Sequence, residues 1–252
     1  METIIIISVL STLGVVALGT AIVVAFRMLP SLVWRIPTLG TFNLHASLLP
    51  QYRGAAPINW AVINGEKESG VTTFLIDDKI DTGNILLQEK VVLAEGETAG
   101  SLHDKLQELG AALVLKTVHG LAEGNIKAQL QNESSILRNA PKIFREDCRI
   151  DWTLSGEKIE SFIRGMSPYP AAFATVKSDE VNGEIKITSA EFFAEGETSV
   201  APVLKIVGKQ LLVLLPDGAL ELKYLKPQGK RAMPASDFIN GIHNKSQEFN
   251  IS

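Results

Sequence analysis

The C-terminal part of the chain carries the feature that most constrains the fold, a series of short strands. Polar and apolar residues alternate in "GEIKITSAEFF" (residues 183–193), and strand-like runs recur in "VLKIVGKQLLVLLPDGALELKYLKP" (residues 203–227). The Asp-Gly pair in the second stretch is typical of a two-residue hairpin turn. From Ala171 onward we therefore predict a small all-β domain, most simply a Greek-key barrel.

The N-terminal half follows a different pattern. A β-branched run at Ala21–Phe26, the stretch "GTFNLH" ending at His45, and "GVTTFLID" (residues 70–77) are typical of buried strands. Apolar residues at helical spacing predict a long helix over Thr98–Glu123. Strands alternating with helices predict an α/β domain over residues 21–125.

The two predicted domains are separated by a polar stretch. Residues 126–145, "IKAQLQNESSILRNAPKIFR", have the mixed composition of a linker. A further helix is predicted from about Ser155, and Pro168 and Pro170 would end it. We expect the C-terminal domain to extend over residues 146–252.

The first residues differ from the rest. Thr3–Phe26 contains no charged residue, a length and composition that would admit a transmembrane helix. A signal peptide fits less well, because the only charged side chain before the run is Glu2. Alternatively, Ala21–Phe26 is a buried strand and residues 1–20 form a separate, atypical apolar segment.

Composition indicates which cellular compartment and which binding partners suit the chain. The chain has a net charge of −4 and one cysteine, Cys148, so it can form no internal disulfide and suits a reducing cytoplasm. Mild acidity argues against binding nucleic acid through overall charge, although a local basic patch remains open.

Asn43 and His45 are candidate functional residues. They lie two apart at the end of a predicted strand, so both side chains point to the same face. In an open α/β sheet, ligands bind beyond the carboxyl ends of the strands. Taken alone, an Asn-x-His at a strand end is more often structural.

Asp81 strengthens the hypothesis. It stands before Thr82 and Gly83 in a turn after the third strand, where we expect Gly83 to take a positive φ. Asp77 and Asp78 are expected to face solvent. An amide, an imidazole and a carboxylate together can stabilise an oxyanion and move a proton, which suits attack by an amine on a carbonyl carbon.

The same region resembles a known family. "FNLHASLLPQYRGAAPINWAVINGE" followed by "GVTTFLIDDKIDTGNIL" is similar to the active-site region of the 10-formyltetrahydrofolate-dependent formyltransferases, and Asp81 follows Asn43 at the family's interval of 38 residues (81 − 43). "YRGAAPINWAVINGE" and, independently, "LELKYLKPQGKRAMPASDFINGI" (residues 220–242) are most similar to members that formylate methionine carried by initiator tRNA.

The resemblance, which covers residues 21 to about 245, implies a Rossmann-like formyltransferase domain followed by an OB-like β-barrel. It implies that Asn43 donates to the formyl oxygen, that His45 adds positive charge or a proton there, and that Asp81 holds His45 and a water that relays the amine's proton. 10-Formyltetrahydrofolate would be the co-substrate, with no metal.

Two further groups of residues follow from the resemblance. The folate would contact a loop and a strand exit, formed by Ser47, Leu48, Leu49 and Pro50 and by Phe26, Arg27, Met28 and Leu29. Ser47 by itself is interpreted as a turn residue. The barrel would help to hold initiator tRNA through a basic cluster of Lys223, Lys226, Lys230 and Arg231, unless these residues form only a solvated hairpin.

The chain departs from the family at its start, where residues 1–20 match neither the opening strand nor any family loop. A truncated or mis-started gene product, an apolar stretch that replaces a missing element, and a membrane-anchored variant are the alternatives. We expect a cytoplasmic monomer that binds no DNA. A catalytically impaired tRNA-binding remnant remains open, as does formylation of another amine, such as an amino sugar nucleotide or a purine-pathway glycinamide.

Overall fold

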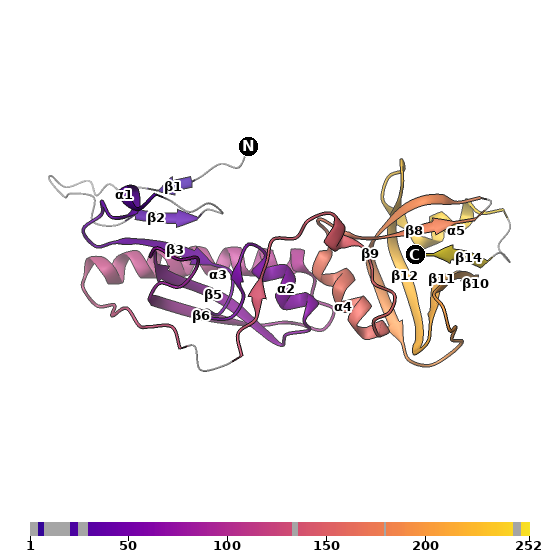
Figure 1. Ribbon diagram of the computed structural model, residues 1–252, viewed down its shortest axis with the longest axis horizontal. Helices are drawn as coiled ribbons and strands as arrows, with labels where there is room; N and C mark the ends of the chain where they lie inside the picture. The colour runs from indigo at the N-terminus through magenta and orange to yellow at the C-terminus, as the bar shows by residue number, and fades with distance from the viewer. Residues whose placement is uncertain (1–4, 8–20, 25–29, 133–135, 179, 244–247) are drawn as a thin grey trace. The chain divides into compact units, whose positions relative to one another are not determined.

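The computed structural model describes the chain except for residues 1–4, 8–20, 25–29, 133–135, 179 and 244–247 (Figure 1). It divides into two compact units. The first consists of Met1–Trp60, Lys67–Ala94 and Leu102–Lys142, and the second of Ala61–Glu66, Glu95–Ser101 and Ile143–Ser252. Much of the stretch whose composition predicts a linker, residues 126–142, thus belongs to the first unit.

A mixed five-stranded sheet forms the first unit, in the order β1-β2-β3-β5-β6. Only β2 and β3 pair in parallel among these strands, and the other neighbours are antiparallel. The predicted third strand begins and ends two residues earlier than expected. The strands are β1 (Ile5–Ile7), β2 (Ala21–Val24), β3 (Thr41–His45), β5 (Glu68–Leu75) and β6 (Ile85–Val92).

The long helix α3 (Ala99–Ala122) covers one face of this sheet (Figure 1). Its apolar side chains, including Val114 and Val118, pack with the buried Phe42 and Leu86. A Cβ at Gly110 would lie 2.8 Å from a methyl carbon of Leu44, so the glycine allows α3 to approach β3 closely. The shorter elements are α1 (Ser31–Trp34), β4 (Arg53–Gly54), α2 (Pro57–Ile63) and β7 (Asn139–Ala140).

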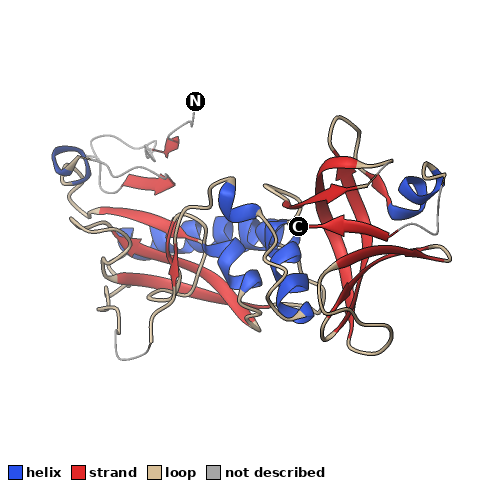
Figure 2. Ribbon diagram, turned by 45° about the vertical axis from the view of Figure 1, so that its right-hand side comes forward, coloured by secondary structure: helices blue, strands red, loops and turns tan. Residues whose placement is uncertain are grey.

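A closed antiparallel β-barrel forms most of the second unit (Figure 2). Its strands follow the order β8-β9-β12-β11-β10-β14, and β14 pairs with β8 to close the ring, which confirms the predicted barrel. β13 pairs with β12 outside the ring. The strands are β8 (Ala172–Lys177), β9 (Asn182–Phe193), β10 (Val203–Val207), β11 (Gln210–Leu215), β12 (Gly218–Pro227), β13 (Met233–Pro234) and β14 (Glu248–Ile251).

The barrel interior and the helix α4 (Gly156–Met166) share one core. Ile159, Ile163 and Met166 of α4 are almost fully buried together with barrel residues such as Ile187 and Leu220. This apolar stripe at helical spacing explains why the segment after Ser155 forms a helix. The remaining elements are the 3-10 helix η1 (Glu146–Cys148) and α5 (Ala235–Asn240).

The apolar N-terminal run contributes two strands to the first sheet, β1 and β2. The other residues of Thr3–Phe26, apart from these strands, lie outside the described part of the chain. No helix in that described part has the length and hydrophobicity needed to cross a membrane.

Candidate active site

Asn43 and His45 lie two residues apart on strand β3, so their side chains point to the same face of the sheet, as their spacing predicts. β3 is held on both edges, because Asn43 is opposite Val23 of β2 and His45 is opposite Thr72 of β5. The two side chains therefore have a fixed position along the strand. His45 is buried, and Asn43 is partly buried.

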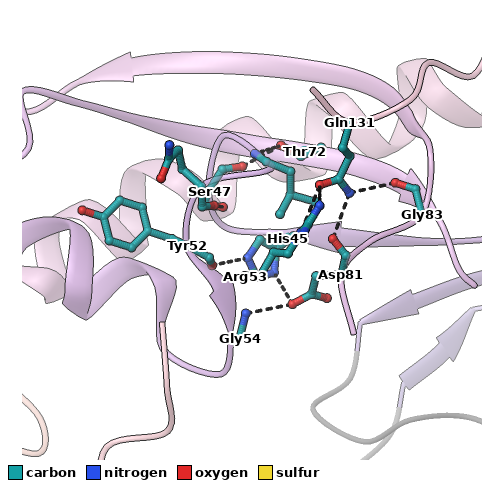
Figure 3. Close-up of polar contacts among 11 residues, drawn as sticks. His45, Ser47, Tyr52, Arg53, Gly54, Thr72, Asp81, Gly83 and Gln131 are labelled. Atoms are coloured by element: carbon teal, nitrogen blue, oxygen red, sulfur yellow. Dashed lines mark hydrogen bonds and ion pairs between the residues drawn. The ribbon is translucent and has the colours of Figure 1, made fainter. Parts of the chain in front are cut away.

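Both ring nitrogens of His45 face oxygen atoms (Figure 3). Nε2 lies 2.8 Å from the carbonyl oxygen of Tyr52, which can only accept, so Nε2 carries a hydrogen. Nδ1 lies 3.7 Å from Oδ2 of Asp81. The ring also meets Phe74 edge-on, with centroids 6.4 Å apart. The Tyr52 carbonyl on one side and the Asp81 carboxylate on the other hold the ring in one orientation.

The Asp81 side chain is held by Gly54 of strand β4. Its Oδ2 accepts a hydrogen bond of 2.9 Å from the backbone N–H of Gly54, while its side chain is only 13% exposed. Among the described residues, no hydrogen bond reaches Oδ1. One carboxylate oxygen is thus fixed, and the other is available to a substrate or water.

The positive φ in this turn lies at Asp81, with a value of 54°, so our expectation that Gly83 would take it is wrong. Gly83 is required for a different reason: a Cβ there would lie 1.6 Å from the carbonyl oxygen of Leu75. The glycine permits close approach of two backbone segments, and the strained backbone falls on the carboxylate residue itself.

Asn43 has an unpaired polar atom. Its Oδ1 is shielded from solvent and has no hydrogen-bond partner among the described residues. A buried polar group without a partner is unfavourable by about 1–3 kcal/mol. The amide is therefore suited to pair with a ligand group, and a half-turn about its Cβ–Cγ bond presents its N–H₂ group in place of the oxygen.

The loop after β3 is fixed by internal hydrogen bonds. Ser47 donates from Oγ to the Gln51 carbonyl at 2.6 Å, in accord with its interpretation as a turn residue. The buried Thr72 hydroxyl donates to the Ser47 carbonyl and accepts from Leu49 N–H. Gln88 donates to the Leu49 carbonyl and to Thr72.

These bonds determine which loop side chains a ligand can reach. Ser47 and Leu49 are 1% and 3% exposed, whereas Leu48 and Pro50 are half-buried. The other residues assigned to the folate by resemblance, Phe26, Arg27, Met28 and Leu29, lie outside the described residues.

Gln131 is a site residue that sequence reasoning missed. Its side chain donates to the carbonyl oxygens of Asp81 and Gly83, both at 2.8 Å (Figure 3). It lies in a segment without strand or helix periodicity, 50 residues from Asp81. The sequence carries no local signal for this contact.

Asp77 and Asp78 are exposed, as expected; Asp77 accepts from Thr82, and Asp78 pairs with Arg35. Among the described residues, no group of three or more His, Cys, Asp or Glu side chains is arranged to hold a metal ion.

The basic cluster lies on and after β12 in the second unit. Lys223 forms ion pairs with Glu221 and Glu191 at 2.6 and 3.1 Å. Burial lowers the pKa of Lys223, but the hydrogen bonds to the two glutamates outweigh this and raise it above its ordinary value. Lys226, Lys230 and Arg231 are exposed and form no ion pair with any described residue.

Comparisons with protein families match both units. A model described as "Formyl transferase" matches residues 14–118, and one described as "Formyl transferase, C-terminal domain" matches residues 142–243. A methionyl-tRNA formyltransferase from Flavobacterium johnsoniae is 47% identical over 221 residues, which are 88% of this chain and 70% of that protein. One from Azobacteroides pseudotrichonymphae is 48% identical over 228 residues, 87% of this chain and 70% of that protein.

Solved structures share the fold. HypX from Aquifex aeolicus in complex with tetrahydrofolic acid matches with a TM-score of 0.64 and 20% identity, over 86% of this chain but only 38% of that one. An N-formyltransferase from Helicobacter canadensis matches with a TM-score of 0.54 and 24% identity, over 72% of this chain and 65% of that one. At these identities the likeness concerns the fold alone.

Proposed function

This chain belongs to the methionyl-tRNA formyltransferase family, and we propose that it transfers a formyl group from 10-formyltetrahydrofolate to the amino group of methionyl-initiator tRNA. Relatives of that name are 45–48% identical over 87–88% of the chain. The observation that carries the proposal is a buried, unpartnered Asn43 oxygen on the same strand face as His45, whose ring faces Asp81.

Asn43 is proposed to act on the formyl oxygen. When an amine attacks the formyl carbon, the carbonyl oxygen gains negative charge and needs a donor. The Asn43 amide sits on a strand held from both sides and has no competing partner among the described residues. It can donate its N–H to that oxygen without losing another bond.

His45 is proposed to supply positive charge beside the same oxygen. Its Nε2–H is engaged by the Tyr52 carbonyl and its Nδ1 faces Asp81, so each ring nitrogen lies beside an oxygen atom. This arrangement favours electrostatic stabilisation, with the ring held in one orientation.

Asp81 is proposed to orient His45 and to guide the amine's proton. The attacking amine must lose one proton when the new C–N bond forms, and the folate nitrogen must gain one when its bond to the formyl carbon breaks. Oδ2 is held by Gly54 N–H and faces His45, which leaves Oδ1 to bind a water that relays the proton.

The residues present fit a folate co-substrate. The Asn43 amide, whose oxygen has no partner among the described residues, can pair with a polar group of the ligand, and the half-buried Leu48 and Pro50 offer apolar surface on a loop fixed by Thr72. We assign the folate to this loop and to residues 26–29.

The domain assignment and cellular setting follow from the same proposal. We propose a catalytic domain over residues 21–125, a connection over 126–145, and a tRNA-binding barrel over 146–252. Lys226, Lys230 and Arg231 would contact tRNA phosphates, with a smaller share for Lys223 because of its glutamate partners. We also propose that the protein acts as a monomer in the cytoplasm and binds no DNA.

An acceptor assay tests the function. The purified chain is mixed with 10-formyltetrahydrofolate and, in separate reactions, with methionyl-initiator tRNA, free methionine and an amino sugar nucleotide. Formyl-methionine recovered from the tRNA reaction alone is the expected result. Formylation of the sugar nucleotide in preference to the charged tRNA would contradict the proposal.

A further inference from the structure

Gln131 is anchored next to the Asp81 turn. Two residues before it, Gln129 exchanges two backbone hydrogen bonds with Ile85, of 2.7 and 2.8 Å, at the start of β6. This anchor brings the Gln131 side chain to the turn that joins β5 to β6. The partly buried side chain lies between that turn and β4 (Figure 3).

The Gln131 amide joins three segments of the chain. Its Nε2 donates to the carbonyl oxygens of Asp81 and Gly83, both at 2.8 Å. Its Oε1 accepts from Nε and Nη2 of Arg53, at 3.2 and 2.7 Å. The next residue after Arg53, Gly54, donates to the Asp81 carboxylate. Asp81 is thus held at its carbonyl and at its side chain by one connected set of bonds.

Only a side-chain amide can make this set of bonds. Arg53 has donors and no acceptor, and the two carbonyl oxygens can only accept. The residue between them must therefore accept on one side and donate on the other. A glutamate at position 131 would keep the acceptor and lose the donor, and a leucine would lose both.

The Asp81 backbone needs such support. A φ of 54° is unfavourable for a residue with a Cβ, by about 1–2 kcal/mol, and persists only where neighbouring contacts hold it. The carbonyl that Gln131 binds belongs to Asp81 itself. Release of this carbonyl would let the turn relax and carry the carboxylate away from His45.

We propose that Gln131 is a positioning residue for the reaction: by binding the carbonyls of Asp81 and Gly83 it fixes the Asp81 carboxylate against His45. The inference rests on the proposed function, because it assigns Gln131 a role through Asp81. Gln131 itself acts through backbone carbonyls and through Arg53, without a direct part in the chemistry.

Steady-state kinetics of two variants test the role. Gln131→Glu and Gln131→Leu should each lower kcat about 10- to 100-fold, because a small displacement of a catalytic group has effects of this size. The KM for tRNA and for folate should change less than about threefold. The exposed Gln129, two residues upstream, offers a matched control, and Gln129→Leu should keep the normal kcat. A Gln131→Glu variant with normal kcat would overturn the proposal, as would a rise in KM at unchanged kcat.

A double-variant cycle separates positioning from general stability. In an Asp81→Asn background, adding Gln131→Leu should lower kcat less than about twofold further, because residues that act as a unit are not additive. The full 10- to 100-fold loss in that background would mean that Gln131 acts elsewhere.

Hydrogen exchange tests the positioning without relying on activity. The backbone amides of residues 81–83 should exchange faster in Gln131→Leu than in Gln129→Leu, since only the first loses the carbonyl bonds. Unchanged exchange would overturn the positioning role. Absence of formyl transfer by the unsubstituted chain would instead contradict the proposed function, and the exchange result would still decide whether Gln131 holds the turn.

Discussion

Asp81 combines a strained backbone with a carboxylate that faces a buried histidine. Its φ of 54° is uncommon for a residue other than glycine, although Asp and Asn tolerate it better than most. Strain of this kind clusters at functional sites, where surrounding contacts maintain it. Here the contacts are the Gly54 N–H and the Gln131 amide.

Asp81→Asn should therefore separate activity from stability. Asn accepts the same φ and can accept the Gly54 N–H, so the melting temperature should stay close to normal. Loss of the negative charge removes the proton relay and should lower kcat about 100-fold or more. Thermal unfolding and a formylation time course measure the two effects, with the exposed Asp78→Asn as control. An active Asp81→Asn enzyme would contradict the proposed relay.

Among single residues, Cys148 is a buried, structural thiol. It is 3% exposed, and burial raises its pKa above the ordinary value, against a smaller lowering effect of Lys186. A raised pKa in the folded state stabilises the fold below the ordinary thiol pKa, and this stability is lost as pH rises through the folded value.

We expect iodoacetamide to modify the native protein slowly even above about pH 8.5, the ordinary thiol pKa, and rapidly in urea. Mass spectrometry of the alkylated protein measures both rates. The Cys148→Ser variant provides the blank, because the chain has no other cysteine. Equal alkylation rates in the two states would show that the thiol is accessible.

At the scale of elements, the site depends on where β3 and β5 end. The antiparallel register places His45, at the end of β3, opposite Thr72 in the middle of β5, and the turn after β5 folds back so that Asp81 meets the Gly54 N–H of β4. Gly83 makes this return possible, because its missing Cβ lets the backbone pass close to the Leu75 carbonyl.

Gly83→Ala should destabilise the turn and impair activity together. The added methyl group would lie 1.6 Å from the Leu75 oxygen, and the backbone shift that relieves the clash should lower the free energy of unfolding by about 1–3 kcal/mol. Urea denaturation measures the change. Gly241→Ala is a suitable control, since its Cβ would meet nothing nearer than 3.4 Å and its φ is −83°. A normal stability for Gly83→Ala would show that the turn adjusts freely.

Sequence periodicity predicted the main elements, including the long helix, the strand that carries Asn43 and His45, and the barrel. Repeated local patterns encode such elements. The residue that takes the positive φ was predicted wrongly, and the Gln131 contact was not predicted. Both depend on how distant backbone segments pass one another, which no local pattern around Asp81 or in residues 126–145 indicates.

At the scale of the whole molecule, the acidic chain is proposed to bind a polyanion through a local basic cluster. The net charge is −4, so overall attraction to tRNA is weak, and the cations on and after β12 that pair with no described residue must dominate. Lys223 differs from the others because Glu221 and Glu191 neutralise it.

Salt dependence of tRNA binding measures these contributions. Lys226→Ala, Lys230→Ala and Arg231→Ala should each reduce the slope of log Kd against log salt concentration by about 1, as expected for the loss of one phosphate contact. Lys223→Ala should have a smaller effect, and Lys205→Ala, which removes a lysine paired with Glu197, should have none. Filter binding at several potassium chloride concentrations gives the slopes. Unchanged slopes for the first three variants would place the tRNA contacts elsewhere.

The most direct test of the account is the single-turnover rate of formyl transfer to methionyl-initiator tRNA in a His45→Ala variant. His103→Ala is the control, because His103 also pairs with an aspartate but is 59% exposed on α3. We predict a loss of about 100-fold or more for His45→Ala and no loss for His103→Ala. A His45→Ala variant that transfers formyl groups at the normal rate would contradict the assignment of the active site to Asn43, His45 and Asp81.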